Sequence, residues 1–523
     1  MVEERFNKTL LPTLNRAFDE HADAACLCFK DQVFSYAQVG QLSARIANQL
    51  LANGFHPGMK GAVYSLNSAL SFIATLGIVR AGGVWIPINP RNSEQDNVAI
   101  LRKFGVDAVF YQQAFGAPIE AFVSDGAQVV CLDNEHLAYP GLNAWLGDSG
   151  SAPPDVALAP TDLVSIPLTG GTTGLPKGVM LSHRNFSALE YATREMYGDR
   201  NPVVLCAAPM THVGGRIALC GLSSGVRFVI LETVDPQLVL RTIQEERITD
   251  TFLPPTGVYS LLDQPNLADF DLSSLVSFSY GSAPISTERL KEALRRIGPV
   301  MRGGFGQTEC PMFIARLHPE EHFVDGELGG ALMPDARLRS VGRATMISEL
   351  GIVDAQGNEV AIGERGEIAV KGPMVSEGYY EAPEETAKIR VNGWHLTGDI
   401  GFMDDEGFLY VVDRKKDMII TGGFNVYSAE VEQALMEIPG VQLAVVYGVP
   451  DDKWGEAVAA QIKLEPGVTL AEVDVIVAAK QSVGGVKAPK QVAFVEDFPR
   501  TPVGKIDKKV LRDQAWADAD RSI

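Results

Sequence analysis

The stretch from Ser165 to Val179 holds the densest group of residues suited to chemistry, Ser-Ile-Pro-Leu-Thr-Gly-Gly-Thr-Thr-Gly-Leu-Pro-Lys-Gly-Val. Glycines can turn consecutive backbone N–H groups toward one anion, because they lack a Cβ and accept positive φ. Threonine hydroxyls add donors, and Lys177 adds a compact positive charge. The spacing is not that of a Gly-Lys-Ser/Thr loop, since Pro176 and Gly178 flank the lysine. The stretch predicts a phosphate-binding loop, with a flexible surface loop as the alternative. The residues of the predicted loop are Thr169, Gly170, Gly171, Thr172, Thr173, Gly174 and Lys177.

The elements around this loop alternate between strand-like and helix-like segments. The apolar run from Leu163 to Leu168 predicts a short strand that leads into the loop. The alternation predicts an α/β fold with a mostly parallel sheet covered by helices. The segments are a helix from Leu11, a hairpin over 25–34, a helix from Ser35 to Gly54, and 61–65, 68–79, 83–88, 96–104, 108–111, 203–206, 228–231, 236–246 and 250–252.

The last third of the chain has a different pattern of predicted elements. From about Arg337, short β runs with glycine-rich turns predict a small β subdomain. A charge cluster from Asp413 to Asp417 then predicts a linker, although such clusters are often only solvated turns. A short α+β unit follows, with helices expected over 428–437 and 470–479.

Composition bounds the class of protein. A chain of 523 residues predicts two to four structural units, and 46% hydrophobic with 21% charged residues is typical of a globular enzyme. A net charge of −20 argues against nucleic acid as a partner, which needs a basic footprint. The six cysteines form no Cys-x-x-Cys pair, so neither zinc nor a disulfide scaffold is indicated. The sequence has no apolar run of about 18 residues and no apolar signal-peptide core, which predicts a cytoplasmic protein without a membrane span.

The segment Thr169–Gly178 resembles the phosphate-binding loop of the adenylate-forming enzymes. This superfamily comprises acyl-CoA synthetases, firefly-type luciferases and nonribosomal-peptide adenylation domains. The usual form is Thr-Ser-Gly-Thr-Thr-Gly-x-Pro-Lys-Gly, and here Gly170 stands where serine is common, which removes one hydroxyl donor. Further motifs extend the resemblance over nearly the whole chain. It implies a large N-terminal domain of βαβ-type sheet subdomains plus a β subdomain (1–413), a hinge (414–416) and a small mobile C-terminal α+β domain (417–523).

Two motifs resemble the family's nucleotide site, although each alone would be an ordinary turn. Tyr280-Gly-Ser-Ala-Pro284 resembles the adenine-binding turn, which implies that Ser282, Ala283 and Pro284 contact the purine. Gly304-Phe-Gly-Gln-Thr-Glu309 resembles Tyr-Gly-x-Thr-Glu, with Phe305 replacing the tyrosine. The resemblance implies that Gly304 and Phe305 lie at the nucleotide with the Phe305 ring stacked on adenine, that Thr308 donates to the α-phosphate, and that Glu309 is a Mg²⁺ ligand.

Three later motifs complete the expected catalytic set. Thr397-Gly-Asp399 and Asp413-Arg414 resemble the family's ribose-binding residues, Asp399 and Arg414. Arg500-Thr-Pro-Val-Gly-Lys505 resembles the loop of the catalytic lysine. The chemistry that this implies is attack of a carboxylate on the α-phosphate of ATP, in which Lys177, Lys505 and Mg²⁺ neutralise the repulsion between two anions.

The second half-reaction and the acyl group depend on other segments. Lys416 lies at the family's hinge position, and Gly422-Gly423 matches the glycines along which coenzyme A passes, with a plain β-turn as the alternative. Pro209-Met-Thr-His212 matches the segment that places a gating residue beside the carboxylate; His212 is equally compatible with a core histidine. The predicted acyl pocket comprises His212, Val213, Gly214, Gly215, Tyr280, Gly281 and Gly303.

The resemblance therefore implies an acyl-CoA synthetase that uses ATP, Mg²⁺ and coenzyme A. The glycines of the pocket favour a fatty or aryl acid over acetate. Free coenzyme A is the expected acceptor, because the chain ends 18 residues after Lys505 and leaves no room for a carrier domain. A ligase that loads a carrier protein, a luciferase-like oxygenase and a non-catalytic nucleotide sensor remain alternatives. The oligomeric state stays open, with a homodimer as one option.

Overall fold

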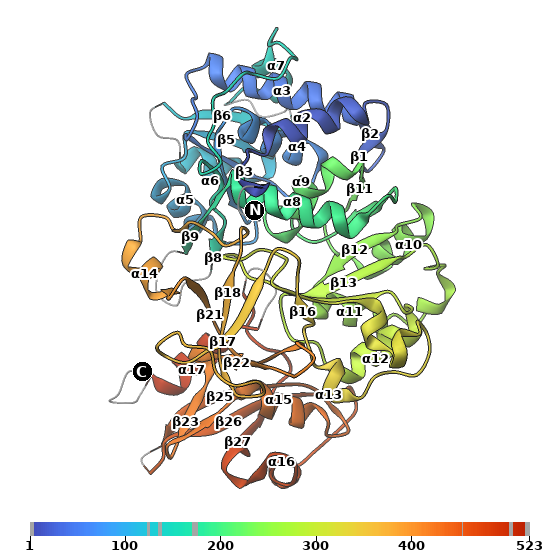
Figure 1. The fold of residues 1–523 in the computed structure, drawn as a ribbon, viewed down its shortest axis with the longest axis vertical. Coiled ribbons are helices and arrows are strands. Elements are labelled where there is room, and N and C mark those ends of the chain that lie inside the picture. Colours follow the sequence, from blue (N-terminus) through green and yellow to red (C-terminus); the bar gives the residue numbers. More distant parts are fainter. Residues whose placement is uncertain are drawn as a thin grey trace. The chain divides into compact units, whose positions relative to one another are not determined.

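The computed structural model describes residues 5–122, 126–133, 139–169, 176–451, 453–501 and 506–517 (Figure 1). The chain divides into two compact units. Unit 1 comprises Met1–Glu349 and Lys371–Lys388, and unit 2 comprises Leu350–Val370 and Ile389–Ile523. The predicted hinge at 414–416 lies within unit 2, so the proposed domain boundary there remains a prediction.

The first sheet of unit 1 has the strand order β19-β9-β7-β4-β3-β5-β6, with β8 paired to β9. Strands β3 to β7 run parallel, and β9 joins them antiparallel. The strands are β3 (Lys60–Tyr64), β4 (Val84–Ile88), β5 (Ala108–Tyr111), β6 (Gln128–Cys131), β7 (Leu163–Ser165), β8 (Leu168–Thr169), β9 (Lys177–Ser182) and β19 (Gly378–Tyr379). Unit 1 also contains the helices α3 (Tyr36–Ala52), α4 (Ala69–Arg80), α5 (Glu94–Lys103), α6 (Gly116–Phe122), α7 (Leu142–Leu146) and α14 (Pro383–Lys388).

The second sheet of unit 1 has the order β16-β15-β14-β13-β12-β10-β11-β1-β2. From β14 to β1 all neighbours are parallel. The strands are β1 (Ala25–Phe29), β2 (Gln32–Ser35), β10 (Val203–Cys206), β11 (Arg227–Ile230), β12 (Asp250–Leu253), β13 (Ser277–Gly281), β14 (Met301–Phe305), β15 (Ala315–Leu317) and β16 (Arg343–Ala344). The other helices of unit 1 are α2 (Leu11–Glu20), α8 (His183–Tyr197), α9 (Val213–Gly221), α10 (Pro236–Glu245), α11 (Pro255–Leu262), α12 (Thr287–Arg296) and α13 (Asp335–Leu338), and of these α8 packs against β7 and β9 of the first sheet.

Helix α4 explains how the two sheets share one interior. It is apolar on every side, and all but one of its residues are buried. It packs against β3, β4 and β5 of the first sheet and against β1 of the second. A helix without a polar face is stable only when it is covered all round, so α4 is the buried layer between the sheets.

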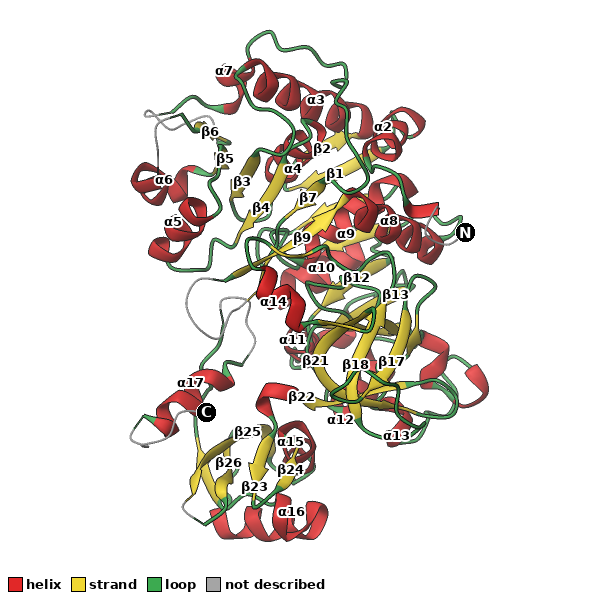
Figure 2. Cartoon of the chain, turned by 60° about the vertical axis from the view of Figure 1, so that its left-hand side comes forward, coloured by secondary structure: helices red, strands yellow, loops and turns green. Residues whose placement is uncertain are grey.

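Unit 2 contains two smaller sheets (Figure 2). One is β17-β18-β21-β20 with β22 on β21, around a core of Val353, Ala369 and Trp394. The other is β24-β23-β26-β25 with β27 on β26, packed by α15 and α16. The elements are β17 (Glu349–Val353), β18 (Gly366–Lys371), β20 (Arg390–Val391), β21 (Trp394–Met403), β22 (Leu409–Arg414), β23 (Ile419–Thr421), β24 (Phe424–Val426), α15 (Ser428–Met436), β25 (Val441–Asp451), β26 (Gly455–Leu464), α16 (Glu472–Lys487), β27 (Gln491–Phe494) and α17 (Lys508–Trp516).

The predicted α/β fold class is confirmed, with local differences in the bounds of single elements. The helix expected from Ser35 begins at Tyr36, and the Ser35 hydroxyl accepts from the Gln38 N–H as its N-cap. The strand expected over 163–168 is instead two short strands, β7 and β8, separated by Ile166 and Pro167. Proline has no N–H for the ladder, which accounts for the break. No helix among the described residues is long and apolar enough to span a membrane.

Candidate active site

The carboxyl ends of the parallel strands in the second sheet bring three predicted segments to one edge. The loop with His212 follows β10, the turn at Ser282 follows β13, and the loop with Glu309 follows β14. Strand β10 lies between β11 and β12, so the strand order reverses there. Open parallel sheets bind ligands at such a reversal, outside the carboxyl ends of the strands. This edge is therefore the candidate active site.

In the predicted adenine turn, the residue type at Gly281 suits its backbone surroundings, whereas the residue type at Ser282 does not suit its backbone conformation. Gly281 pairs with Gly304 across β13 and β14, and a Cβ on Gly281 would lie 2.5 Å from the Gly304 carbonyl oxygen. Ser282 then adopts φ of 68°, a left-handed conformation that is unfavourable for a non-glycine residue. Strain of this kind persists at sites where the surrounding structure fixes the backbone, and it fits a ligand-binding turn. Ser282, Ala283 and Pro284 are exposed there.

Glu309 is buried at the end of the next loop, with an exposed fraction of 8%. Its Oε1 accepts a hydrogen bond of 2.7 Å from the Tyr379 hydroxyl. Burial lowers the pKa of the nearby Arg216 to about 10, and the Glu309 carboxylate opposes that shift. Phe305 and Thr308 are half-buried before Glu309. The loop thus presents one oriented carboxylate, the hard oxygen ligand that Mg²⁺ prefers in a site completed by phosphates.

The segment around His212 is packed tightly at the start of α9. The His212 N–H donates to the Pro209 carbonyl at 2.9 Å. A Cβ on Gly214 would lie 2.5 Å from the Ala208 oxygen, and one on Gly215 would lie 2.0 Å from the Met210 oxygen. Close backbone packing therefore explains these two glycines. An acyl pocket formed by His212, Val213, Gly214 and Gly215 remains a prediction.

The other three predicted pocket positions, Tyr280, Gly281 and Gly303, lie on the neighbouring strands β13 and β14. Tyr280 is buried in the core of the second sheet, where its hydroxyl lies 3.2 Å from His322 Nε2. A Cβ on Gly303 would lie 3.0 Å from Leu317 Cβ and 3.1 Å from the Tyr280 hydroxyl. The Tyr280 side chain thus packs in the core with its hydroxyl beside Gly303, and a role for these positions in an acyl pocket remains a prediction.

Lys177 begins the second strand of the predicted phosphate hairpin. Thr169 at the end of β8 pairs with Lys177 at the start of β9. Lys177 Nζ lies 2.5 Å from Glu385 Oε2 and 5.1 Å from the centre of the Tyr379 ring. The two lysines Lys177 and Lys388 lower the pKa of Glu385 to about 2. Gly170, Gly171, Thr172, Thr173 and Gly174 lie outside the described residues.

In unit 2, the predicted ribose residues contact each other. Asp399 on β21 and Arg414 on β22 face across the ladder, and Arg414 Nε donates to Asp399 Oδ1 at 2.9 Å. Asp413 is buried and accepts from the N–H and the hydroxyl of Ser428, and burial raises its pKa. Lys415 pairs with Glu367 at 2.7 Å. The residues next to the predicted hinge are therefore all held by polar contacts within unit 2.

Three further predicted residues, Lys416, Gly422 and Gly423, lie just before β23 and in the turn that follows it. Gly422 and Gly423 have φ of 56° and 82° and form the two-residue turn between β23 and β24. Tight hairpins of this kind need positive φ at both positions, so the turn accounts for both glycines. Lys416 is exposed, and its carbonyl accepts from Arg512 Nη1 at 2.8 Å. A coenzyme A role for these residues remains a prediction, and Lys505 lies outside the described residues.

Sequence reasoning missed Tyr379, Glu385 and Arg216. No motif in the sequence marks the first two, because their partners Glu309 and Lys177 are distant along the chain. Arg216 had a usable signal, since a charged residue inside the apolar run of α9 must be buried with it.

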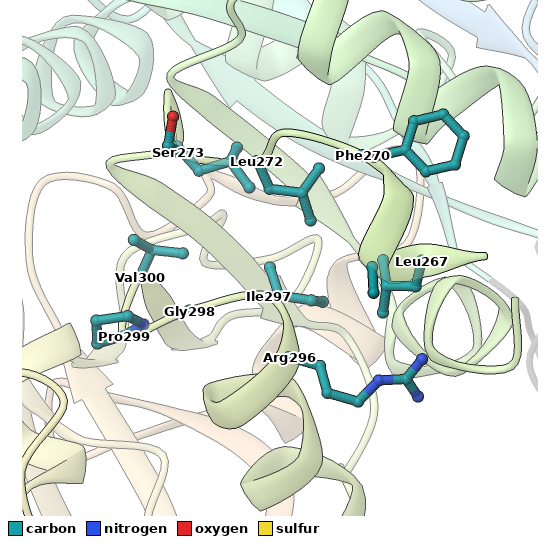
Figure 3. A pocket seen from close by; sticks show the side chains of 11 residues that line it. Leu267, Phe270, Leu272, Ser273, Arg296, Ile297, Gly298, Pro299 and Val300 are labelled. Carbon is teal, nitrogen blue, oxygen red and sulfur yellow. The ribbon is translucent and has the colours of Figure 1, made fainter. Parts of the chain in front are cut away.

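A separate hollow of about 470 Å³ lies at the other end of β14 (Figure 3). Pro299 and Val300, which directly precede β14, line it together with Leu267, Phe270, Leu272 and Ile297. None of its lining residues belongs to the predicted site. The hollow is therefore distinct from the candidate active site at the carboxyl edge.

The candidate edge and the hairpin that contains Lys177 both lie within unit 1. Residues 14–380 match the family described as AMP-binding enzyme, and residues 430–505 match the AMP-binding enzyme C-terminal domain. The chain therefore belongs to the AMP-binding family of adenylate-forming acid–thiol ligases, which use ATP and a carboxylic acid. The family prediction from the sequence is confirmed.

Individual relatives differ in the acceptor that their names give. The chain is 40% identical over 374 residues to the medium/long-chain-fatty-acid–CoA ligase FadD8 of Mycobacterium tuberculosis, covering 70% of this chain and 64% of that protein. It is 30% identical to the fatty acid–[acyl-carrier-protein] ligase ScoC of Streptomyces coeruleorubidus, over 99% of this chain and all of that one. The ATP-bound structure of MatB from Rhodopseudomonas palustris superposes with a TM-score of 0.88 at 28% identity, covering 98% of this chain and 100% of that one.

Proposed function

We propose that this protein is an ATP-dependent acyl-CoA synthetase that acts on a fatty or aryl acid. One observation carries the proposal. Lys177 Nζ lies 5.1 Å from the centre of the Tyr379 ring, and the hydroxyl of the same ring donates to Glu309 at 2.7 Å. Lys177, a cation suited to phosphate, and Glu309, a carboxylate suited to Mg²⁺, therefore both contact the side chain of Tyr379.

In the first half-reaction, an oxygen of the substrate carboxylate attacks the α-phosphorus of ATP. The new O–P bond forms as the bond to the β-phosphate oxygen breaks, and pyrophosphate leaves. Two anions must approach each other, so preorganised positive charge lowers the barrier most. Lys177 would hold the outer phosphates and Lys505 would face the reacting oxygens. Mg²⁺, held by Glu309 and the phosphates, would supply further neutralising charge.

In the second half-reaction, a thiol sulfur attacks the acyl carbon, the bond to the phosphate oxygen breaks, and AMP leaves. The names of the relatives support two acceptors, coenzyme A and a carrier protein. Coenzyme A is our first choice, and a carrier protein is the second candidate because of the full-length similarity to ScoC.

Lys505→Ala should suppress ATP–pyrophosphate exchange by about 100- to 1,000-fold, because removing one preorganised donor costs about 3–4 kcal/mol of barrier. The exchange is measured with radiolabelled pyrophosphate in the presence of a panel of acids. Lys509→Ala, in the nearby helix α17, is the control and should exchange at the wild-type rate. Wild-type exchange in the Lys505 variant would overturn its role.

The acceptor is identified by mass spectrometry of the products. Short, long and aromatic acids are incubated with ATP and either coenzyme A or a phosphopantetheinylated carrier protein. An acyl-CoA thioester supports the proposal. Accumulation of acyl-AMP with coenzyme A, together with acylation of the carrier protein, would favour the second candidate.

A further inference from the structure

The segment Gly378–Lys388, which we call the clamp, contains β19 and α14 and is fixed onto the phosphate hairpin. Gly378 and Tyr379 pair with Met180 and Val179 of β9. The Tyr379 N–H donates to the Thr386 hydroxyl at 2.9 Å, which joins the two halves of the clamp. Both halves therefore keep a defined position beside Lys177 at the start of β9.

The clamp reaches both charged groups of the candidate nucleotide site. Its Tyr379 hydroxyl donates to Glu309, and its Glu385 carboxylate pairs with Lys177 at 2.5 Å. Glu385 also pairs with Lys388 at 2.5 Å, on the same helix. The lysine proposed to bind phosphate is thus paired with a carboxylate from the chain itself.

The two clamp contacts differ in how easily a ligand can replace them. Glu309 is 8% exposed, so its bond to Tyr379 is shielded from water. The Lys177 and Glu385 side chains are 39% and 36% exposed. An ion pair with this much solvent access gains little over the hydrated ions, and another anion can displace it. A polyphosphate carries more negative charge than one carboxylate and can compete for Lys177.

We propose that Glu385 is an internal counter-anion that occupies Lys177 in place of a phosphate and is displaced when a polyphosphate binds. The inference rests on the proposed role of Lys177 in binding the outer phosphates. Glu385 holds Lys177 in place before ATP arrives, and it competes with bound pyrophosphate afterwards. This competition between Glu385 and phosphate for Lys177 lowers the affinity for both ATP and pyrophosphate, and it favours release of pyrophosphate after adenylation.

The test compares Glu385→Gln with the control Glu384→Gln. Glu384 is the neighbour of Glu385 on α14 and forms no ion pair with the described residues. Dissociation constants for ATP and for inorganic pyrophosphate are measured by calorimetry at low and high salt. Glu385→Gln should bind both ligands about two- to fivefold more tightly at low salt, the range expected for removing one exposed ionic competitor. The gain should shrink at high salt, because screening weakens exposed pairs. Glu384→Gln should match the wild type.

Unchanged or weaker binding by Glu385→Gln, or the same gain in Glu384→Gln, would overturn the proposal. A purely structural role for Glu385 would alter the unfolding midpoint without a salt-dependent change in affinity. Lys177→Met separates this result from failure of the proposed function. If Lys177→Met binds pyrophosphate as well as the wild type, the phosphate role of Lys177 itself fails, whatever Glu385→Gln does.

Discussion

Lys177–Glu385 in unit 1 and Lys508–Glu432 in unit 2 are ion pairs of the same residue types in different surroundings. The Lys177 and Glu385 side chains are 39% and 36% exposed, whereas those of Lys508 and Glu432 are 22% and 15% exposed. Lys508 also donates to the Ser428 hydroxyl, which in turn donates to the buried carboxylate of Asp413. Burial lowers the pKa of Lys508, but the carboxylates of Glu432 and Asp413 raise it by more.

The difference separates two uses of a lysine. A buried charge must keep its partner, because an unpaired charge away from water is costly. A half-exposed charge can exchange its partner for a ligand at little cost. The Lys508 network therefore maintains unit 2 next to the predicted hinge, whereas the Lys177 pair suits reversible binding.

The strongest test of this contrast is Lys508→Met. The variant leaves Glu432 and Asp413 without their cation, so unit 2 should lose about 3–5 kcal/mol of stability. Urea unfolding followed by a probe in unit 2 measures the loss. Lys177→Met should leave the unfolding midpoint at its wild-type value. Equal losses in the two variants would remove the distinction between the pairs.

A buried histidine extends the contrast to a group that forms no ion pair with the described residues. His183 is 1% exposed, and burial lowers its pKa to about 4. The unfolded chain, with an ordinary pKa of about 6.5, binds the proton first, so stability falls as the pH drops from about 6.5 to 4. Over this whole pH range, the free energy of unfolding of unit 1 should fall by about 3 kcal/mol.

The measurement is urea unfolding between pH 7 and pH 4, followed by a probe in unit 1. His183→Asn should flatten the acid loss, since an asparagine oxygen can still accept from the Leu10 N–H as His183 Nδ1 does at 3.3 Å. His56→Asn, at an exposed position, is the control and should keep the wild-type slope. A wild-type slope in His183→Asn would show that other groups cause the acid loss.

The smallest effect is expected from Lys388→Met. Lys388 is 68% exposed and shares the Glu385 carboxylate with Lys177. Without it, Glu385 should pair with Lys177 alone and compete better with ATP. The affinity for ATP should weaken within about twofold, opposite in sign to Glu385→Gln. Calorimetry measures the affinity for ATP, and tighter binding by Lys388→Met would contradict the proposed competition of Glu385 with phosphate for Lys177.

Local patterns predicted the fold well because the signals and the elements occupy the same residues. Ser35 marked the start of α3, and the apolar runs at 108–111 and 203–206 coincide with β5 and β10. The family motifs predicted nucleotide-binding roles for Glu309 and Lys177, but they did not predict the residues that contact them. Lys177 and Glu385 are 208 positions apart, and Glu309 and Tyr379 are 70 apart. Pairings over such distances depend on how strands assemble, which periodicity does not encode.

Positive φ angles have different meanings at two of the predicted sites. Gly422 and Gly423 have a complete explanation in the hairpin turn, so their presence alone cannot support a ligand. Ser282 is the opposite case, because its left-handed backbone occurs at a residue that does not favour it. An unfavourable conformation is the stronger indication of a functional constraint.

The close backbone contacts at Gly214, Gly215 and Gly281 set a limit for protein engineering. A methyl group at any of the three would meet a main-chain oxygen within 2.5 Å. Libraries that aim to change the preferred acid should therefore keep these positions fixed and vary the neighbouring side chains. In the predicted acyl pocket, substitutions therefore fit only at positions where no main-chain oxygen lies this close.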